Sequence, residues 1–297
     1  MEAKKRMKNL ILSAACMLAL NATAAITVND DDGRAVTLAK PALRVIALAP
    51  HVTEMIYAAG GSGRLVAAVD YSDFPEAAKK LPRVGSNRQI DMERVAALKP
   101  DLIVVWMHGS SERQIDQIRA LGFPLFHSEP KKLDDIASNL TRLGKLMGTE
   151  AVADPAAAAL RSKLAALSAQ YAKRSPVRMF YQFWDKPLYT LNGDHIISDA
   201  ARICGAENVF ARLKVTAPVV DIEGVLQEDP EVIISGSTAP DAGLDMWKAT
   251  PGMTAVKRGN LFRVDGNLLN RSGPRMIDGA AALCEKLDLA RQHRKAP

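Results

Sequence analysis

The chain has 297 residues, of which 48% are hydrophobic, 24% charged and 5% aromatic, and its formal net charge is +6. This length allows two lobes or one large domain, and the apolar fraction suffices for a packed core, which excludes disordered, collagen-like and low-complexity classes. A mean hydropathy of -0.04 is typical of a soluble protein rather than a polytopic membrane protein. Because the positive charge is mild and partly confined to the first residues, we expect no nucleic-acid partner.

The first 24 residues have the three-part pattern of a secretory signal peptide. Basic side chains at positions 4, 5, 6 and 8 precede an apolar run over 10–20, which is shorter than the ~20 residues that span a bilayer. Ala22-Thr23-Ala24 then provides a cleavage signal, so we expect residues 1–24 to be removed on export. Lipidation of Cys16 stays open, although Ser13 stands where a lipobox has leucine.

Beyond the signal, apolar runs and breaks predict alternating strands and helices. A turn at 30–33 separates two short strands, and the later Val/Ile/Leu runs are typical of parallel strands buried on both faces. The predicted elements before position 148 are strands at 44–48, 65–69, 102–106 and 124–127 and helices at 52–59 and 111–121, followed by helical sequence from 133 with breaks at Gly144 and Gly148.

Residues 155–173 form the most strongly helical segment, with no glycine or proline after the Asp154-Pro155 helix start. Such a helix extends nearly 30 Å, about one small domain, at ~1.5 Å per residue. A strand at 177–183 and a last helix at 274–291 resume the alternation. We therefore predict an α/β protein with two Rossmann-like lobes, joined by one long interdomain helix, and a ligand cleft between the lobes. The predicted division is a signal peptide at 1–24, an N-terminal lobe at 25–148, the linking helix at 149–174 and a C-terminal lobe at 175–297.

A repeated pattern supports two related lobes. Positions 91–104 and 221–234 match at a constant offset of 130 residues. Each copy has an aspartate that caps a short helix, a glutamate in the first turn, a proline and then a buried strand. The alternative is coincidence, because this combination is a common α/β turn.

Export leaves Cys204 and Cys284, an even pair in an oxidising compartment. A disulfide between them would close a loop of about 80 residues. Two buried free thiols are the alternative, and both apolar helical contexts suit either state.

Catalytic motifs are mostly absent from the sequence. It has no G-x-S-x-G, H-E-x-x-H or Walker A pattern, and a dinucleotide-like start at Gly61-Ser62-Gly63 lacks its third glycine, because Val66 stands there. The five histidines share no ligand spacing, so we expect neither a metal site nor a cofactor. These absences favour a binding protein over the rival interpretation, a secreted α/β metal-dependent enzyme that uses the same cleft.

Several segments resemble the periplasmic substrate-binding proteins of iron-siderophore, haem and cobalamin ABC importers, and the cobalamin-binding branch is the most similar. The segments are 28–38, 44–50 with Thr53-Glu54, 71–75, 91–106 with 112–114, and 203–210, and Gly273-Pro274-Arg275 matches the start of the branch's last helix. The resemblance implies a periplasmic, non-enzymatic protein that is a monomer when free, captures a metal chelate and delivers it to a permease in the inner membrane. It also implies a disulfide between Cys204 and Cys284.

The resemblance assigns Glu93 and Glu223 to docking, because family members use one glutamate on each lobe to engage permease arginines. Two carboxylates at equivalent helix starts suit such a two-point contact. The alternative is that both only stabilise the helices that they begin.

The resemblance also implies ligand-binding residues. Tyr71, Trp106 and Phe183 match aromatic positions of the cobalamin branch, and Arg271 matches a polar one. Trp184, next to Phe183, would supply aromatic surface in place of tryptophans that this chain lacks. The chain departs from the branch at Asn87 and Ala217, where tryptophans are expected, and at Asn267, where an acid is expected.

These departures leave a ferric siderophore or haem open as the ligand. Arg88 and Arg271 would suit an anionic siderophore chelate, and Tyr71, His51 or His108 would suit haem iron.

Tyr71 and Trp106 follow predicted N-lobe strands, and Phe183 ends the first strand after the long helix. We therefore predict that the three rings face one another across the gap between the lobes. The alternative is that each ring only covers its own lobe.

Overall fold

The computed structural model describes residues 25–86, 89–106, 112–237 and 243–294. The predicted signal peptide at 1–24, which includes Cys16, lies outside the described residues. So do three candidate residues of the sequence analysis, Asn87, Arg88 and His108. No helix in the described part is long and apolar enough to cross a membrane.

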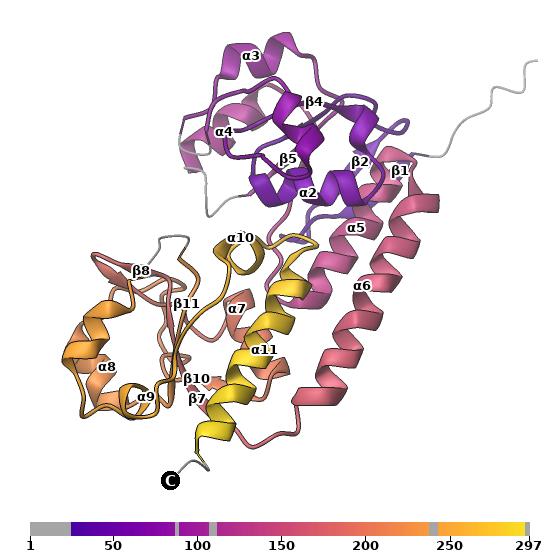
Figure 1. The fold of residues 1–297 in the computed structure, drawn as a ribbon. Helices are drawn as coiled ribbons and strands as arrows, with labels where there is room; N and C mark the ends of the chain where they lie inside the picture. The colour runs from indigo at the N-terminus through magenta and orange to yellow at the C-terminus, as the bar shows by residue number, and fades with distance from the viewer. Residues whose placement is uncertain (1–24, 87–88, 107–111, 238–242, 295–297) are drawn as a thin grey trace, which may run out of the picture.

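The N-terminal lobe is built on a parallel sheet of order β4-β3-β5-β6 (Figure 1). Its strands are β3 (Val45–Ala47), β4 (Leu65–Ala68), β5 (Leu102–Val105) and β6 (Leu125–His127), and a hairpin of β1 (Ile26–Asn29) and β2 (Ala35–Leu38) lies beside it. Helices α2 (Pro50–Ala58), α3 (Met92–Ala97) and α4 (Glu112–Ala120) connect the strands, with 3-10 helices at Ser62–Arg64 and Glu76–Lys80. β5 is buried at every position, as its apolar run predicts.

The C-terminal lobe has a parallel sheet of order β10-β7-β11-β12. Its strands are β7 (Val177–Gln182), β10 (Ala206–Asn208), β11 (Val232–Ser235) and β12 (Leu261–Arg263), with a small hairpin of β8 (Trp184–Asp185) and β9 (Leu188–Tyr189). The helices are α7 (Ile196–Ile203), α8 (Ile222–Glu228), α9 (Thr254–Lys257), α10 (Gly266–Leu269) and α11 (Met276–His293), with a 3-10 helix at Asp245–Ala249.

The two sheets have the same topology, which confirms the repeat seen in the sequence. In each sheet the strand that comes first in the chain lies between the second and the third, and the fourth lies beyond the third. The repeated segments form α3 with β5 and α8 with β11, which hold the same place in the two lobes. Asp91 and Asp221 cap their helices by accepting hydrogen bonds from the amides of Arg94 and Gly224.

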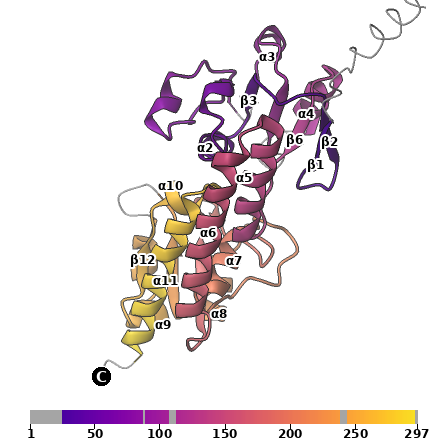
Figure 2. The ribbon, with the colours of Figure 1, turned by 90° about the vertical axis from the view of Figure 1, so that its right-hand side faces the viewer.

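Two long helices, α5 (Leu133–Met147) and α6 (Glu150–Tyr171), run side by side along the edge of the molecule (Figures 1 and 2). α6 extends from one lobe to the other, and Leu160 near its middle packs against the hydrophobic cores of both. This confirms the two lobes and the long interdomain helix. The start predicted at Asp154-Pro155 is wrong, because α6 begins at Glu150 and Pro155 lies inside its second turn.

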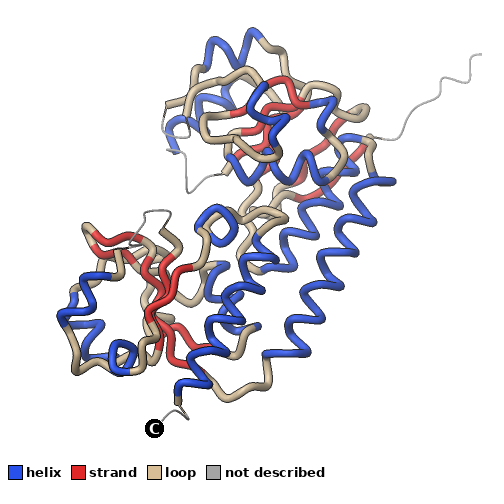
Figure 3. Tube along the Cα trace, in the orientation of Figure 1, coloured by secondary structure: helices blue, strands red, loops and turns tan. Residues whose placement is uncertain are grey.

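α5 also bridges the lobes, which the sequence analysis did not predict. Leu133 and Ile136 in its first turn belong to the core of the C-terminal lobe, whereas Leu140 and Leu143 belong to the core of the N-terminal lobe. The chain therefore crosses to the C-terminal lobe before α5, returns to the N-terminal lobe along α5 and crosses again along α6 (Figure 3). The paired helices make this connection stiffer than a flexible loop hinge.

Cys204 and Cys284 form a disulfide with a Cα–Cα distance of 4.8 Å. Both residues are fully buried in the C-terminal core, where Cys204 ends α7 and Cys284 lies in α11. The bond therefore ties two helices that pack on the same side of the sheet core, and the alternative of free thiols does not apply to this structure.

We expect replacement of both cysteines by alanine to lower the free energy of unfolding by about 4 kcal/mol in chemical denaturation, because the native bond closes a loop of 80 residues. Labelling of the denatured, unreduced mature protein should find no free thiol. Two reactive thiols per chain, with a double variant as stable as the parent, would contradict a structural role for the bond.

Candidate ligand-binding cleft

A cavity with a volume of about 910 Å³ lies between the two lobes. We call it the aromatic cavity, and its lining residues are Pro50, Tyr71, Phe183, Trp184, Pro187, Tyr189, Ala217, Gly236, Ser237, Gly266, Asn267, Asn270 and Arg271. Several of these follow the carboxyl ends of parallel strands: Pro50 follows β3, Tyr71 follows β4 and Gly236 follows β11. This is where ligands bind in open α/β sheets.

Tyr71 and Trp184 present large apolar surfaces to this cavity. Tyr71 is 78% exposed and Trp184 57% exposed, although each ring would gain free energy from burial. The φ of Tyr71 is +62°, an unusual conformation for a bulky residue. The indole of Trp184 donates a hydrogen bond to the Lys186 carbonyl oxygen at 3.2 Å. Phe183 beside it is half-buried and packs on the C-terminal core.

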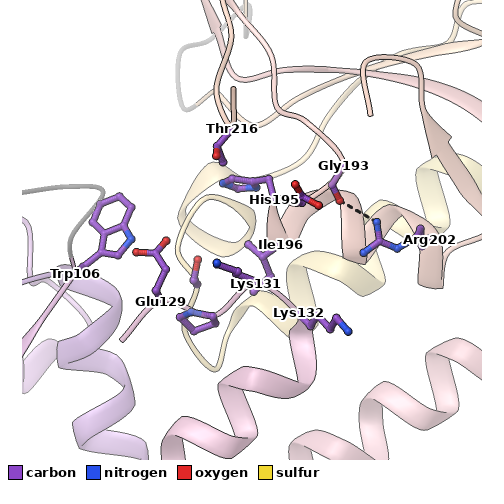
Figure 4. A pocket seen from close by; sticks show the side chains of 12 residues that line it. Trp106, Glu129, Lys131, Lys132, Gly193, His195, Ile196, Arg202 and Thr216 are labelled. Atoms are coloured by element: carbon purple, nitrogen blue, oxygen red, sulfur yellow. Dashed lines mark hydrogen bonds between the residues drawn. The ribbon is translucent and has the colours of Figure 1, made fainter. Parts of the chain in front are cut away.

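Trp106 does not line the aromatic cavity with Tyr71 and Phe183, and it stays a prediction that these three rings face one another. It lines a second space of about 460 Å³ between the lobes, which we call the side cavity (Figure 4). The strand order explains the separation. Tyr71 follows β4 and Trp106 follows β5, and β3 lies between these strands, which places their ends about 10 Å apart.

The side cavity is more polar than the aromatic cavity. The segment that crosses between the lobes supplies Glu129, Pro130, Lys131 and Lys132, and the C-terminal lobe supplies Gly193, Asp194, His195, Ile196, Arg202, Thr216 and Ser272. Sequence reasoning missed these residues and also Tyr189 and Asn270 of the aromatic cavity. Many of them lie in loops, and this position was the available signal, but it does not distinguish them from other loop residues.

Arg271 lines the aromatic cavity but is paired with carboxylates of the other lobe. Its guanidinium donates to Asp73 Oδ1 at 2.6 Å and to Glu54 Oε1 at 3.3 Å. Burial alone would lower the pKa of Arg271, but Asp73 and Glu54 outweigh it and raise that pKa. The same contact lowers the pKa of Asp73.

Glu54 is the centre of this contact between lobes. It lies in α2, is only 3% exposed, and its two carboxylate oxygens accept hydrogen bonds from Arg275 at 2.9 and 2.7 Å. Arg275 also lies over the Phe74 ring at 3.9 Å from its centroid. Glu54, Asp73, Arg271 and Arg275 therefore form an ion cluster that joins the lobes at the base of the cleft.

His51 lies behind Trp106 and is not a lining residue of either cavity. Its ring meets the indole edge to face, with centroids 5.4 Å apart. Burial lowers the pKa of His51 to about 4, so the imidazole is neutral at neutral pH. Within the described ranges, no group of three or more His, Cys, Asp or Glu side chains is placed to hold a metal ion.

Glu93 and Glu223 lie in the first turns of α3 and α8, at matching positions of the two lobes. Both are exposed, and both α3 and α8 begin with a capping aspartate. The geometry therefore leaves both carboxylates accessible to a partner.

The sequence profile of the periplasmic binding protein family matches residues 45–268. The chain belongs to this family. The family assignment agrees with the two-lobed fold and with the expectation of a binding protein rather than an enzyme.

Two relatives within this family are vitamin B12-binding proteins. The chain is 40% identical over 253 residues to that of Vibrio cholerae serotype O1, covering 85% of this chain and 91% of the relative. It is 38% identical over 249 residues to that of Yersinia pestis, covering 84% and 88%.

Solved structures of the family agree with the fold. The periplasmic vitamin B12-binding protein of Vibrio cholerae superposes with a TM-score of 0.80 at 39% identity, covering 84% of this chain and 98% of that one. A periplasmic haem-binding protein of Roseiflexus superposes with a TM-score of 0.72 at 22% identity, covering 83% and 98%, which is a likeness of fold.

We expect Glu54→Ala to lower the free energy of unfolding by about 3 kcal/mol, because it leaves two partly buried guanidinium groups without their shared carboxylate. Chemical denaturation measures this loss. Glu76→Ala is the matched control, since it removes a carboxylate that is 83% exposed and pairs with Lys79, and it should cost under ~1 kcal/mol. Equal effects of the two variants would contradict a structural role for the ion cluster.

Proposed function

We propose that this chain is the substrate-binding component of an ABC importer and that it binds cobalamin or a closely related corrinoid. The observation that carries the proposal is the aromatic cavity of about 910 Å³ between the lobes, which exposed rings of both lobes line. A broad and flat macrocycle would bury these rings on both of its faces. The B12-binding relatives at 38–40% identity support the same ligand class.

The charge of the aromatic cavity favours a corrinoid over an anionic chelate. Among the described lining residues, Arg271 alone carries a formal charge, and Asp73 and Glu54 neutralise it. A ferric siderophore or haem carboxylate would have to displace Asp73 or remain unpaired, which costs free energy in a partly dry site. A corrin is rimmed by uncharged amides, which suit the exposed amide of Asn267.

Haem is the second candidate, and one observation favours it. Tyr71 has a phenol oxygen, the type of ligand that some haem proteins use for iron, and its side chain is exposed in the cavity. His51 does not line the cavity, so it offers no such ligand there.

The proposal assigns separate roles to the predicted site residues. Tyr71, Phe183, Trp184 and Arg271 form the wall that contacts the ligand, and Trp106 contacts it from the side cavity. Residues 1–24 direct export, so the mature chain acts in the periplasm as a monomer when free. It then delivers the ligand to an inner-membrane permease, which Glu93 and Glu223 contact.

Titration of the mature protein with cyanocobalamin, haem and a ferric siderophore tests the ligand class. We expect saturable binding of cyanocobalamin in calorimetry, weakened by Trp184→Ala by ~1–3 kcal/mol, or roughly fivefold to 150-fold in Kd. Trp184→Phe is the matched control and should retain most of the affinity, because it keeps an aromatic face. Saturation by haem or the siderophore but not by cyanocobalamin would replace the proposed ligand.

Glu93→Ala and Glu223→Ala should leave ligand Kd unchanged but reduce uptake in a reconstituted transporter. Each substitution removes one carboxylate from a proposed charged contact, worth ~2–5 kcal/mol if the pair is buried and less at a rim. Glu207→Ala removes an exposed carboxylate elsewhere on the C-terminal lobe and serves as the control. Loss of ligand binding together with normal permease association would show that these glutamates do not serve docking.

A further inference from the structure

The aromatic cavity and the side cavity adjoin along two separate stretches of chain. Ala217 lines the aromatic cavity and the preceding residue, Thr216, lines the side cavity. Arg271 and Ser272 divide between the two cavities in the same way. Because consecutive Cα atoms are ~3.8 Å apart, the two cavities lie close to each other at both places.

The side cavity offers two lysine side chains, whereas the charged residue described in the aromatic cavity, Arg271, is paired with carboxylates. Lys131 and Lys132 lie in the segment after β6 that crosses between the lobes. Neither ammonium group has a carboxylate within 4 Å in the part of the chain that the structure describes. In Figure 4 the Lys131 side chain lies between Glu129 on one side and Ile196 on the other, whereas Lys132 points away from them. Lys131 is therefore the cation best placed to meet an occupant of this space.

The other charges of the side cavity are largely balanced by their neighbours. Arg202 donates to Asp199 at 3.0 Å and to the Gly193 carbonyl oxygen at 3.0 Å. Glu129 lies 3.6 Å from His127 Nε2. Burial opposes protonation of His127, but Glu129 and Asp32 outweigh it and raise its pKa. Asp194 remains as an exposed carboxylate against two lysines, so the balance of this cavity is positive.

We infer that the side cavity is a second compartment of the ligand site and holds an anionic, phosphate-bearing arm of the ligand, with Lys131 as its cationic contact. This inference rests on the proposed function. The uncharged macrocycle occupies the aromatic cavity, and the arm passes the 216–217 and 271–272 positions into the side cavity. A volume of about 460 Å³ is within the range of small-ligand pockets, so the compartment has room for more than a phosphate group.

A pair of corrinoids tests this inference. Cyanocobalamin carries a phosphodiester in its nucleotide arm, and dicyanocobinamide lacks that arm. Lys131→Glu should weaken cyanocobalamin binding roughly tenfold by reversing a charge next to the phosphate, and it should leave the Kd for dicyanocobinamide within about twofold. The loss should shrink as ionic strength rises, because salt screens a partly exposed contact.

Lys145→Glu is the matched control. Lys145 is exposed in the last turn of α5, and the charge change is the same, but the residue lies about 20 Å along the helix from Lys131. It should affect neither ligand. Circular dichroism and thermal melting check that both variants fold, which their exposed positions favour.

Each result has one interpretation. A selective loss of cyanocobalamin affinity in Lys131→Glu supports the inference. Normal or equally weakened binding of both corrinoids by Lys131→Glu overturns the second compartment and leaves the proposed function intact. Failure of the wild-type protein to bind either corrinoid contradicts the proposed function itself, and the inference falls with it.

Discussion

A buried carboxylate shared by two arginines of the opposite lobe determines the geometry of the cleft. Glu54 is 3% exposed and accepts hydrogen bonds from Arg271 and Arg275. Moving the lobes apart at this edge would break both of its charged contacts, which opposes such a motion. Together with the paired helices α5 and α6, this cluster favours small adjustments on ligand binding over a large opening of the lobes.

The same cluster also determines the charge that a ligand meets. Because Asp73 and Glu54 hold the guanidinium of Arg271, the aromatic cavity presents rings and amides rather than a free cation. The ammonium groups of Lys131 and Lys132, which have no carboxylate within 4 Å among the described residues, lie instead in the side cavity, on the segment that crosses between the lobes. Under the proposed function, selection of a neutral macrocycle and recognition of an anionic arm are thus separated in space, although both depend on how the lobes meet.

The sequence predicts what depends on local pattern. Buried apolar runs identify β5 and β11, and the capping residues Asp91 and Asp221 identify the helices before them, so the repetition of this helix–strand unit in the two lobes follows. Local pattern does not give strand order, which is why Trp106 was expected in the same cavity as Tyr71. It also does not show which core a helix face enters, so the bridging role of α5 was missed.

The ion cluster is the clearest limit of sequence reasoning. Glu54 and Arg271 are separated by 217 positions, and each is an ordinary charged residue in its own segment. Their contact arises only when α2 of one lobe meets the loop before α11 of the other. The two cysteines differ from these charged residues, because a cysteine forms a disulfide only with another cysteine. Their long-range contact can therefore be predicted from the sequence.

The division of the cavity wall between the lobes suggests how binding proceeds. The C-terminal lobe supplies most of the wall, including Trp184 and Asn267, whereas the N-terminal lobe supplies Pro50 and the exposed ring of Tyr71. Since the ion cluster already joins the lobes, the ligand enters a cleft whose two walls are in place. Little conformational free energy is then lost on binding, and more of the energy of ring contact remains for affinity. A protein that only captures and delivers its ligand needs this preformed site and no reacting groups, which agrees with a cavity lined by rings and amides.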